Sequence, residues 1–188
     1  MYNTKFKGDV CSHSHSYFLD NSFRKFFQNP RRLLGEYIDP GDLVVDLGCG
    51  PGFFSIEMAR MAGETGRVIA VDLQTEMLEK VKAKAIRKGL LDRMRLHACT
   101  QDRIGLEDTV KADFVLAYYM VHETLDHLDF LKQVKQILKT SGRFLLVEPV
   151  FHVSKYHFQQ IVDAAVSAGF SLVDLPGKKG GRSALLTV

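Results

Sequence analysis

The sequence contains few cysteines, and those present are far apart. Cys11, Cys49 and Cys99 are the three in 188 residues, and none belongs to a C-x-x-C pair. An odd, scattered set argues against a disulfide-stabilised fold and against a cysteine-rich zinc site, and it fits a reducing compartment. The chain must then fold by burying an ordinary hydrophobic core, for which its length and 46% hydrophobic content are sufficient.

Long apolar runs and a strong net charge are also missing. No stretch approaches the roughly 18 to 20 apolar residues that a membrane-spanning helix needs, and residues 1–20 lack the continuous apolar core of a signal peptide. A net charge of +3 is too small to indicate nucleic-acid binding by itself. We therefore expect a single compact domain without a membrane span, located in the cytoplasm.

The chain is organised around residues 43–61, LVVDLGCGPGFFSIEMARM. Its first residues predict a buried parallel strand that carries Asp46 near its end, and a helix is predicted to open at about Phe53. Between them lie three glycines, Gly48, Gly50 and Gly52. Glycines this dense indicate close approach of the backbone to a ligand, or φ angles that other residues resist. A helix N-terminus directs free N–H groups into the same space.

A second buried strand is predicted over residues 67–72, RVIAVD, and it ends in Asp72, 24 residues after Gly48. In a doubly wound sheet Asp72 would lie beside the glycine turn, where a carboxylate can accept both hydroxyls of a ribose. The glycine spacing is G-x-G-x-G, whereas the dinucleotide fingerprint is G-x-G-x-x-G. This difference argues against a nicotinamide-dependent oxidoreductase.

Strands and helices alternate along the rest of the chain. A short helix capped by Asn21 or Ser22 and another from Pro30 to Tyr37 precede the first strand; further helices are predicted over 74–88, 126–139 and 155–168. Strands are predicted over 93–98, 112–120, 143–148, 171–175 and 183–188, with a turn at Ser141–Gly142 before the third of these. The loop PGKKGGR is too short for a crossover helix, so the last two strands should pair antiparallel. The pattern predicts an α/β, Rossmann-like, doubly wound sheet of seven strands, mostly parallel with a C-terminal antiparallel strand.

The segment VVDLGCGPGF followed by VIAVD resembles motifs I and II of the class I S-adenosylmethionine-dependent methyltransferases. QTEML after the second strand is similar to the group that includes the ubiquinone/menaquinone C-methyltransferases and the arsenite methyltransferases, although the cysteine pattern of the latter is not matched. The resemblance covers roughly residues 40–150. It implies S-adenosylmethionine as cofactor, a cofactor-binding domain over residues 40–188, and an N-terminal arm with helices over residues 1–39 that covers the site.

The resemblance also implies roles for individual residues. Asp46 and the glycine turn would hold the methionine end, Asp72 the ribose, and Gln101 or Asp102 the adenine amino group. The full set implied to bind the cofactor is Asp46, Gly48, Cys49, Gly50, Gly52, Phe53, Asp72, Leu73, Gln74, Gln101, Asp102 and Tyr118. Three alternatives remain open from the residues alone: Asp46 can merely satisfy local backbone donors, Asp72 can be the N-cap of the next helix, and Asp102 can cap a short helix.

No catalytic residue is identified from the sequence, and His122, Tyr118 and Tyr119 are candidates. The two tyrosines alternate on a strand, so one should face the core and at most one should form a wall of the site. His122, beside Glu123 in the following loop, can act as a general base near neutral pH or can merely hold the loop by hydrogen bonds.

Cys11, His13 and His15 are the candidate metal ligands. In an extended strand they would project from one face, and such donors suit zinc, copper or a soft metalloid. A polar arm rich in His and Ser needs no metal, and a fourth ligand is not evident. Two alternatives therefore stay open: a metal bound by these three residues, and no metal.

The methyl acceptor is the least determined feature. The segment AYYMVHE lacks both the Asn/Asp-Pro-Pro-aromatic signature of amino methylation and the acid of metal-dependent catechol O-methyltransferases. We expect methyl transfer to a small molecule, with a nucleic acid or protein acceptor as an alternative. A protein that binds S-adenosylmethionine without catalysis is the rival of a different class, and the oligomeric state is left open.

Overall fold

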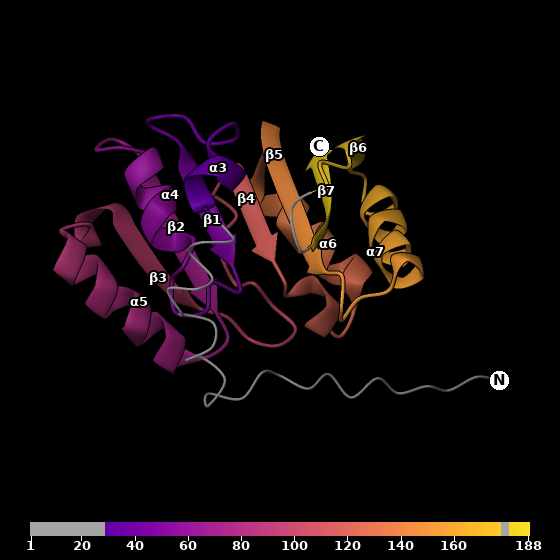
Figure 1. The fold of residues 1–188 in the computed structure, drawn as a ribbon, viewed down its shortest axis with the longest axis horizontal. Coiled ribbons are helices and arrows are strands. Elements are labelled where there is room, and N and C mark those ends of the chain that lie inside the picture. The colour runs from indigo at the N-terminus through magenta and orange to yellow at the C-terminus, as the bar shows by residue number, and fades with distance from the viewer. Residues whose placement is uncertain (1–28, 178–180) are drawn as a thin grey trace.

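The computed structural model describes residues 29–177 and 181–188, and this part of the chain forms one seven-stranded sheet (Figure 1). The strand order is β3-β2-β1-β4-β5-β7-β6. The strands are β1 (Leu43–Leu47), β2 (Arg67–Asp72), β3 (Met94–Ala98), β4 (Ala112–Tyr118), β5 (Leu138–Pro149), β6 (Ser171–Asp174) and β7 (Gly181–Thr187). Strands β1 to β5 are parallel, β7 is antiparallel to β5, and β6 is antiparallel to β7. The predicted doubly wound α/β fold is confirmed.

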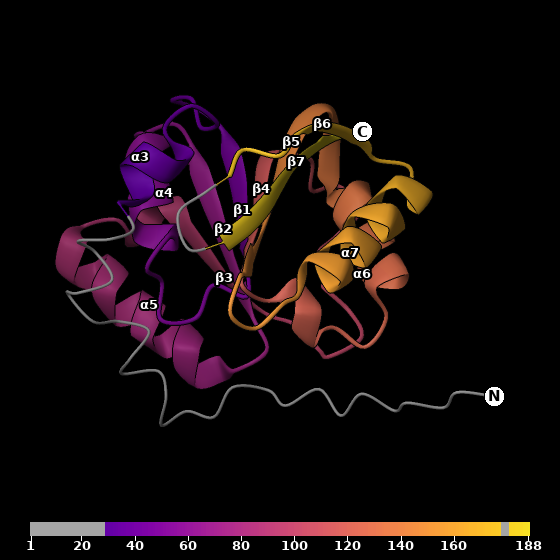
Figure 2. The same ribbon diagram turned by 45° about the vertical axis from the view of Figure 1, so that its right-hand side comes forward.

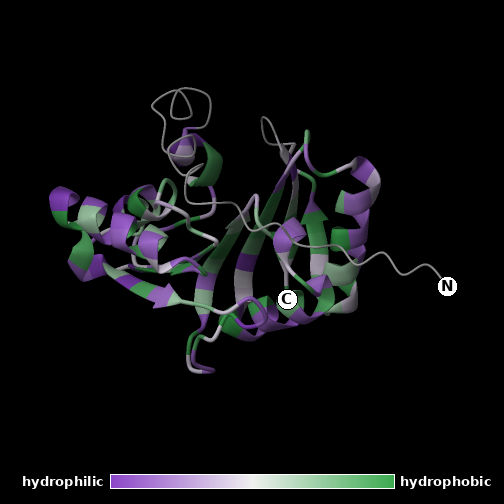
Figure 3. Ribbon diagram, turned by 90° about the horizontal axis from the view of Figure 1, so that it is seen from below, coloured by the Kyte–Doolittle hydropathy of each residue, from purple (hydrophilic) through white to green (hydrophobic). Residues whose placement is uncertain are grey.

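Helices cover both faces of the sheet (Figures 1 and 2). One face carries α3 (Pro30–Leu34), α4 (Ser55–Met61) and α5 (Thr75–Lys88), and the other carries α6 (His127–Ile137) and α7 (Lys155–Ser167). Successive residues of a strand pack on opposite faces of the sheet. Val44 packs in the core beneath α3 and α4, and Val45 packs in the core beneath α6 and α7. Figure 3 shows apolar residues concentrated along the strands, as a sheet buried on both faces requires.

The strand order reverses direction between β1 and β4. From β1 the chain proceeds outward to β2 and β3, and then returns to the other side of β1 to form β4 and β5. At the carboxyl ends of β1 and β4, the loops that follow these two strands therefore lead in opposite directions. In open α/β sheets this is where a crevice forms and where ligands bind.

The described end of the N-terminal segment is anchored in the fold. Asn29 caps α3 by accepting hydrogen bonds from the backbone N–H groups of Arg31 and Arg32. The Arg143 guanidinium donates to the carbonyl oxygens of Glu36 at 3.2 Å and Tyr37 at 3.1 Å. Helix α3 ends at Leu34 rather than at the predicted residue 37; residues 35–37 form a turn, in which Gly35 keeps helical dihedral angles.

One predicted loop is wrong. Ser141 and Gly142 lie inside β5, which begins at Leu138 directly after α6. The expected turn is instead a break in register, since Ala112 pairs with Leu138 while Phe114 pairs with Arg143. A Cβ on Gly142 would lie 2.9 Å from the carbonyl oxygen of Ala112, so only glycine fits this close approach. The remaining element boundaries differ from the predictions by one to two residues, mainly because caps and short 3₁₀ turns occupy the ends.

Candidate functional site

A cavity of about 300 Å³ opens at the carboxyl ends of the central strands. Its walls come from the segments that follow β1, β2, β3 and β4, and from the first turns of α6. Eleven of the twelve residues that the sequence implied for cofactor binding line it: Asp46, Gly48, Cys49, Gly50, Phe53, Asp72, Leu73, Gln74, Gln101, Asp102 and Tyr118. The topology therefore brings segments up to 72 residues apart in the chain into one site.

Gly52 is the exception, and the geometry of the glycine turn explains it. All three glycines have positive φ, but a Cβ on Gly52 would lie 3.0 Å from the Val81 side chain of α5, and a Cβ on Gly48 would lie 2.9 Å from the Met120 side chain. Gly50, with φ of 51°, faces open space, since a Cβ there would meet nothing within 4 Å. Gly48 and Gly52 are required for packing, and Gly50 leaves the backbone accessible to a ligand.

Asp72 fixes this turn to the end of β2. Its Oδ2 accepts a hydrogen bond from the backbone N–H of Gly50 at 2.7 Å, and its Oδ1 accepts one from the backbone N–H of Gln74 at 2.9 Å. Burial raises the pKa of this carboxyl, against the lowering effect of these backbone donors. The N-cap residue of α5 is Gln74, so the alternative of Asp72 as N-cap is wrong. A carboxylate has about four acceptor positions, so room remains for ligand hydroxyls.

Asp46 is the most buried acid of the cavity, with 2% of its surface exposed. Burial raises its pKa from 3.8 to about 7; the hydrogen bond from the Ser55 hydroxyl, at 2.5 Å, opposes this and the charge of Asp72 adds to it. By contrast, Asp102 is exposed and accepts a hydrogen bond from the Thr100 hydroxyl at 2.8 Å, which lowers its pKa. Asp46 is thus a carboxyl that a bound cation would help to ionise near neutral pH.

The cavity is strongly acidic. Its described lining has one cationic side chain, Arg103, and six carboxyl groups, Asp46, Asp72, Asp102, Glu123, Asp126 and Asp129. This excess of carboxyl groups over cationic groups favours a cationic ligand, which would also promote ionisation of the carboxyls whose pKa is raised, and it disfavours a diphosphate. Of these residues, Arg103, Glu123, Asp126 and Asp129 were not predicted from the sequence to belong to the site. The signal that could have found Asp126 and Asp129 is their position directly after a loop that leaves the sheet edge.

Tyr118, the last residue of β4, and Tyr119, which follows it, both line the cavity, so the expectation that at most one would do so is wrong. Tyr119 is the one non-glycine residue with positive φ in the described part of the chain, at 63°. This conformation ends the alternation of the strand, while the N–H of Tyr119 still donates to the carbonyl oxygen of Val147 at 2.7 Å. The ring of Tyr119 lies against that of Tyr118, with centroids 4.2 Å apart.

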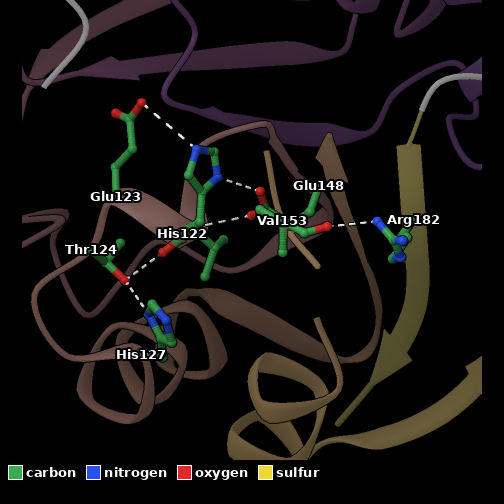
Figure 4. A network of polar contacts seen from close by, with 8 residues as sticks. His122, Glu123, Thr124, His127, Glu148, Val153 and Arg182 are labelled. Carbon is green, nitrogen blue, oxygen red and sulfur yellow. Dashed lines mark hydrogen bonds and ion pairs between the residues drawn. The ribbon is translucent and has the colours of Figure 1, made fainter. Parts of the chain in front are cut away.

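His122 lies behind the cavity wall, on the 3₁₀ turn η3 (Val121–Glu123) (Figure 4). Its Nδ1 contacts the carboxylate of Glu148, which is fully buried at the end of β5. Burial alone would lower the pKa of His122, but the hydrogen bond and charge of Glu148 outweigh it and the pKa is raised. The neighbouring Glu123 does line the cavity. The sequence drew attention to His122, whereas the residue at the wall is Glu123.

The remaining predictions fall partly outside the described residues. Cys11, His13 and His15 lie there, as does the predicted helix capped by Asn21 or Ser22. Among residues 29–177 and 181–188, no group of three His, Cys, Asp or Glu side chains is placed to hold a metal, and no helix is long and apolar enough to cross a membrane. Of residues 29–39 of the expected arm, Leu34, Tyr37 and Ile38 pack in the core, and none of these eleven residues lines the cavity.

Comparisons with known proteins identify the family of the chain. A family model described as a methyltransferase domain matches residues 38–175. A ubiquinone/menaquinone biosynthesis C-methyltransferase of Haemophilus ducreyi is 30% identical over 114 residues, which are 59% of this chain and 44% of that protein. A demethylmenaquinone methyltransferase of Lactococcus lactis is 28% identical over 63% of this chain and 49% of that protein. The chain thus spans about half the length of these curated relatives.

Among solved structures, a SAM dependent methyltransferase from Aquifex aeolicus superimposes with a TM-score of 0.83. The match covers 98% of this chain and 100% of that one, at 24% sequence identity, and it therefore concerns the fold. The family model, by contrast, matches the amino-acid sequence itself, and the match covers more than half of the chain. The chain belongs to the methyltransferase domain family, and its fold is that of the class I S-adenosylmethionine-dependent methyltransferases.

Proposed function

We propose that this protein transfers the methyl group of S-adenosylmethionine to a small-molecule acceptor. The observation that carries the proposal is the acidic cavity beside the open face of Gly50, whose N–H is bonded to Asp72. S-adenosylmethionine is a sulfonium cation with an ammonium group, so a cavity lined by six carboxyl groups suits it far better than it suits a dinucleotide.

The residues present fit this cofactor in the following way. Asp46 and the backbone of the glycine turn would hold the methionine end, and Asp72 would accept the ribose hydroxyls. Gln101 or Asp102 would meet the adenine. The cofactor supplies an electrophilic methyl group, and the protein contributes mainly by holding the acceptor at the right distance and angle.

The aromatic residues of the cavity lining suit an acceptor molecule that is flat and largely apolar. The aromatic residues of the lining are Phe53, Phe54, Tyr118, Tyr119 and Phe130. We assign to the acceptor those outside the cofactor set, which are Phe54, Tyr119 and Phe130. The two curated relatives are named for methylation in quinone biosynthesis, which is consistent with an aromatic small molecule. A nucleic acid or protein acceptor is the alternative, and so is binding of S-adenosylmethionine without turnover.

Two further expectations belong to this proposal. We propose that residues 1–39 are the segment that covers the site of the domain over residues 40–188, although Leu34, Tyr37 and Ile38 of this segment pack in the core. We place the protein in the cytoplasm, which the free thiols Cys49 and Cys99 support.

Transfer of label from [methyl-³H]S-adenosylmethionine tests the function. The full chain is incubated with phenols, quinols, thiols and amines, and separately with bulk RNA and with cell protein. We expect label in a small, aromatic product. Label only in RNA or protein would overturn the small-molecule assignment, and no transfer despite tight binding of S-adenosylmethionine would support the non-catalytic rival.

The control is an Asp72→Ala variant. Because Asp72 is assigned to the cofactor rather than to the acceptor, this variant should lose transfer to every acceptor alike. A variant that loses transfer to one acceptor class only would show that Asp72 lies on the acceptor side.

A further inference from the structure

A buried hydrogen-bond network, formed by Glu148 and His122, lies next to the cavity residue Glu123. Glu148, at 0% exposure near the end of β5, is the most deeply buried acid in the described structure. Its partner across the strand pair is Arg182 on β7. The Arg182 guanidinium donates to the carbonyl oxygen of Val153 at 2.6 Å (Figure 4) and to that of Val150 at 3.3 Å.

The hydrogen bonds that Glu148 accepts come from His122. Its Oε2 contacts Nδ1 of the imidazole, and its Oε1 accepts from the backbone N–H of the same residue at 3.3 Å. The contact fits the tautomer in which Nδ1 carries the proton and donates it to the Glu148 carboxyl oxygen. A buried carboxylate therefore fixes both the tautomer and the orientation of the ring, as in other carboxylate-oriented histidines.

The other imidazole nitrogen points to Glu123. Nε2 of His122 lies 4.0 Å from Oε1 of Glu123, and the Glu123 side chain is 33% exposed and lines the cavity. Burial raises the pKa of Glu123, and the negative charges of Glu148 and Asp72 raise it further while His122 lowers it. Thr124 holds the end of this turn, since its hydroxyl donates to the carbonyl oxygen of Val121 at 2.7 Å and contacts His127 Nδ1 at 2.8 Å.

We propose that Glu123 is the general base of the methyl transfer, and that His122, oriented by Glu148, is a positioning residue that receives the proton from it. This inference rests on the proposed function and deepens it. As the attacking atom of the acceptor gains the methyl group, its bond to hydrogen breaks and the proton passes to the Glu123 carboxylate. The proton then moves to Nε2 of His122, and the resulting imidazolium is stabilised by Glu148.

The proposal defines the chemical class of the acceptor. A base is useful only if the attacking atom carries a proton, as in a phenol, an enolisable carbon acid, a thiol or an amine with an N–H. Tertiary amines, thioethers and pyridine-type nitrogens need no base and would not use this network. The aromatic wall and Glu123 together point to a hydroxylated aromatic compound.

A matched pair of acceptors tests the role of Glu123. 2-Naphthol keeps its proton at pH 8, whereas 1-nitro-2-naphthol has the same ring system and is already ionised there. We expect Glu123→Gln to lower kcat for 2-naphthol by about 10² to 10⁴-fold, with little change in KM, and to lower kcat for 1-nitro-2-naphthol by less than about tenfold. The control is Glu79→Gln, on the exposed face of α5, which should match the wild type. An equal loss with both naphthols, or no loss with either, would overturn the proposal.

A second arm does not depend on turnover. The pKa of His122 is followed by ¹⁵N NMR of the imidazole in the full chain. Its charged neighbours are Glu148 and Glu123, and the rings of His152 and His127 lie close to it. We expect the His122 pKa to fall in both Glu148→Gln and Glu123→Gln. An unchanged pKa in Glu123→Gln would overturn the proton transfer between the two residues.

The two experiments distinguish a failure of the proposed general base from a failure of the proposed methyl transfer. Methylation of quinoline but not of either naphthol would overturn the base while leaving methyl transfer intact. If nothing is methylated although S-adenosylmethionine binds, the proposed function fails and the role of Glu123 as base fails with it. The NMR titration would then still report whether the buried network exists.

Discussion

At the scale of single residues, Asp72 connects the fold to the ligand. Its carboxylate accepts hydrogen bonds from Gly50 and Gln74, so Asp72→Ala leaves two backbone donors without their acceptor. We predict that Asp72→Ala weakens S-adenosylmethionine binding at least tenfold and lowers the free energy of unfolding by about 1 to 3 kcal/mol. Calorimetric titration and urea unfolding measure the two effects. Asp72→Asn, which retains one acceptor oxygen, should recover part of the stability; wild-type affinity in either variant would remove Asp72 from the site.

Asp46 should make the ligand-free protein less stable as the pH rises. Its pKa is about 7 in the folded state, against 3.8 for an ordinary aspartate side chain, so the folded state holds the proton more tightly. The stabilisation from the protonated form is therefore complete below about pH 4 and is lost as the pH rises toward 7, by roughly 4 kcal/mol in total. Urea unfolding from pH 5 to pH 8 should show this decline, and Asp46→Asn should flatten it. A wild-type curve that rises over this range would contradict the assignment.

The sequence was most informative where backbone chemistry leaves a mark on residue type. Acids at strand ends and glycines at positive φ are visible in the sequence, and eleven of the twelve residues implied for the cofactor line the cavity. Glu148 was missed as a partner of His122, because nothing local to residue 148 says which side chain will meet it across the sheet. The contribution of Tyr119 depends on a single backbone angle, which a strand pattern does not reveal.

At the scale of elements, the glycines of the turn after β1 differ in role. Gly48 and Gly52 are required for packing, and Gly50 leaves the backbone accessible to a ligand. Gly50→Ala adds a methyl group in open space and strains one left-handed residue, so we predict a loss of stability of about 1 to 2 kcal/mol together with loss of S-adenosylmethionine binding. Gly48→Ala incurs the same strain and also meets the Met120 side chain at 2.9 Å, so it should destabilise the fold more. Melting temperatures and calorimetric titration of both variants provide the comparison. Normal binding by Gly50→Ala would mean that the ligand does not approach this backbone.

Element order and type followed from the sequence because apolar periodicity and strand-ending acids agree along the chain. The register break in β5 could not be predicted, since it depends on how Leu138 and Arg143 pair with β4 and on the space left at Gly142. Such pairing is a property of two strands together, and no single segment encodes it.

At the scale of the whole molecule, the sheet and both helical layers are complete within the described residues. We predict that deletion of residues 1–17 leaves a folded protein, with altered turnover of the acceptor if the N-terminal segment covers the site. Circular dichroism and a melting curve test the fold, and the label-transfer assay tests turnover. Unfolding of the shortened chain would show instead that residues 1–17 are structural.

The most direct test of the central claim is a series of melting curves with S-adenosylmethionine, S-adenosylhomocysteine and NAD, each titrated separately. A ligand at about 100 times its dissociation constant stabilises the folded state by roughly 2.7 kcal/mol, which shifts the midpoint measurably. The acidic cavity predicts that S-adenosylmethionine and its demethylated product raise the melting temperature and that NAD does not. A rise with NAD alone, or no rise with either sulfur compound, would contradict the assignment of this cavity to S-adenosylmethionine.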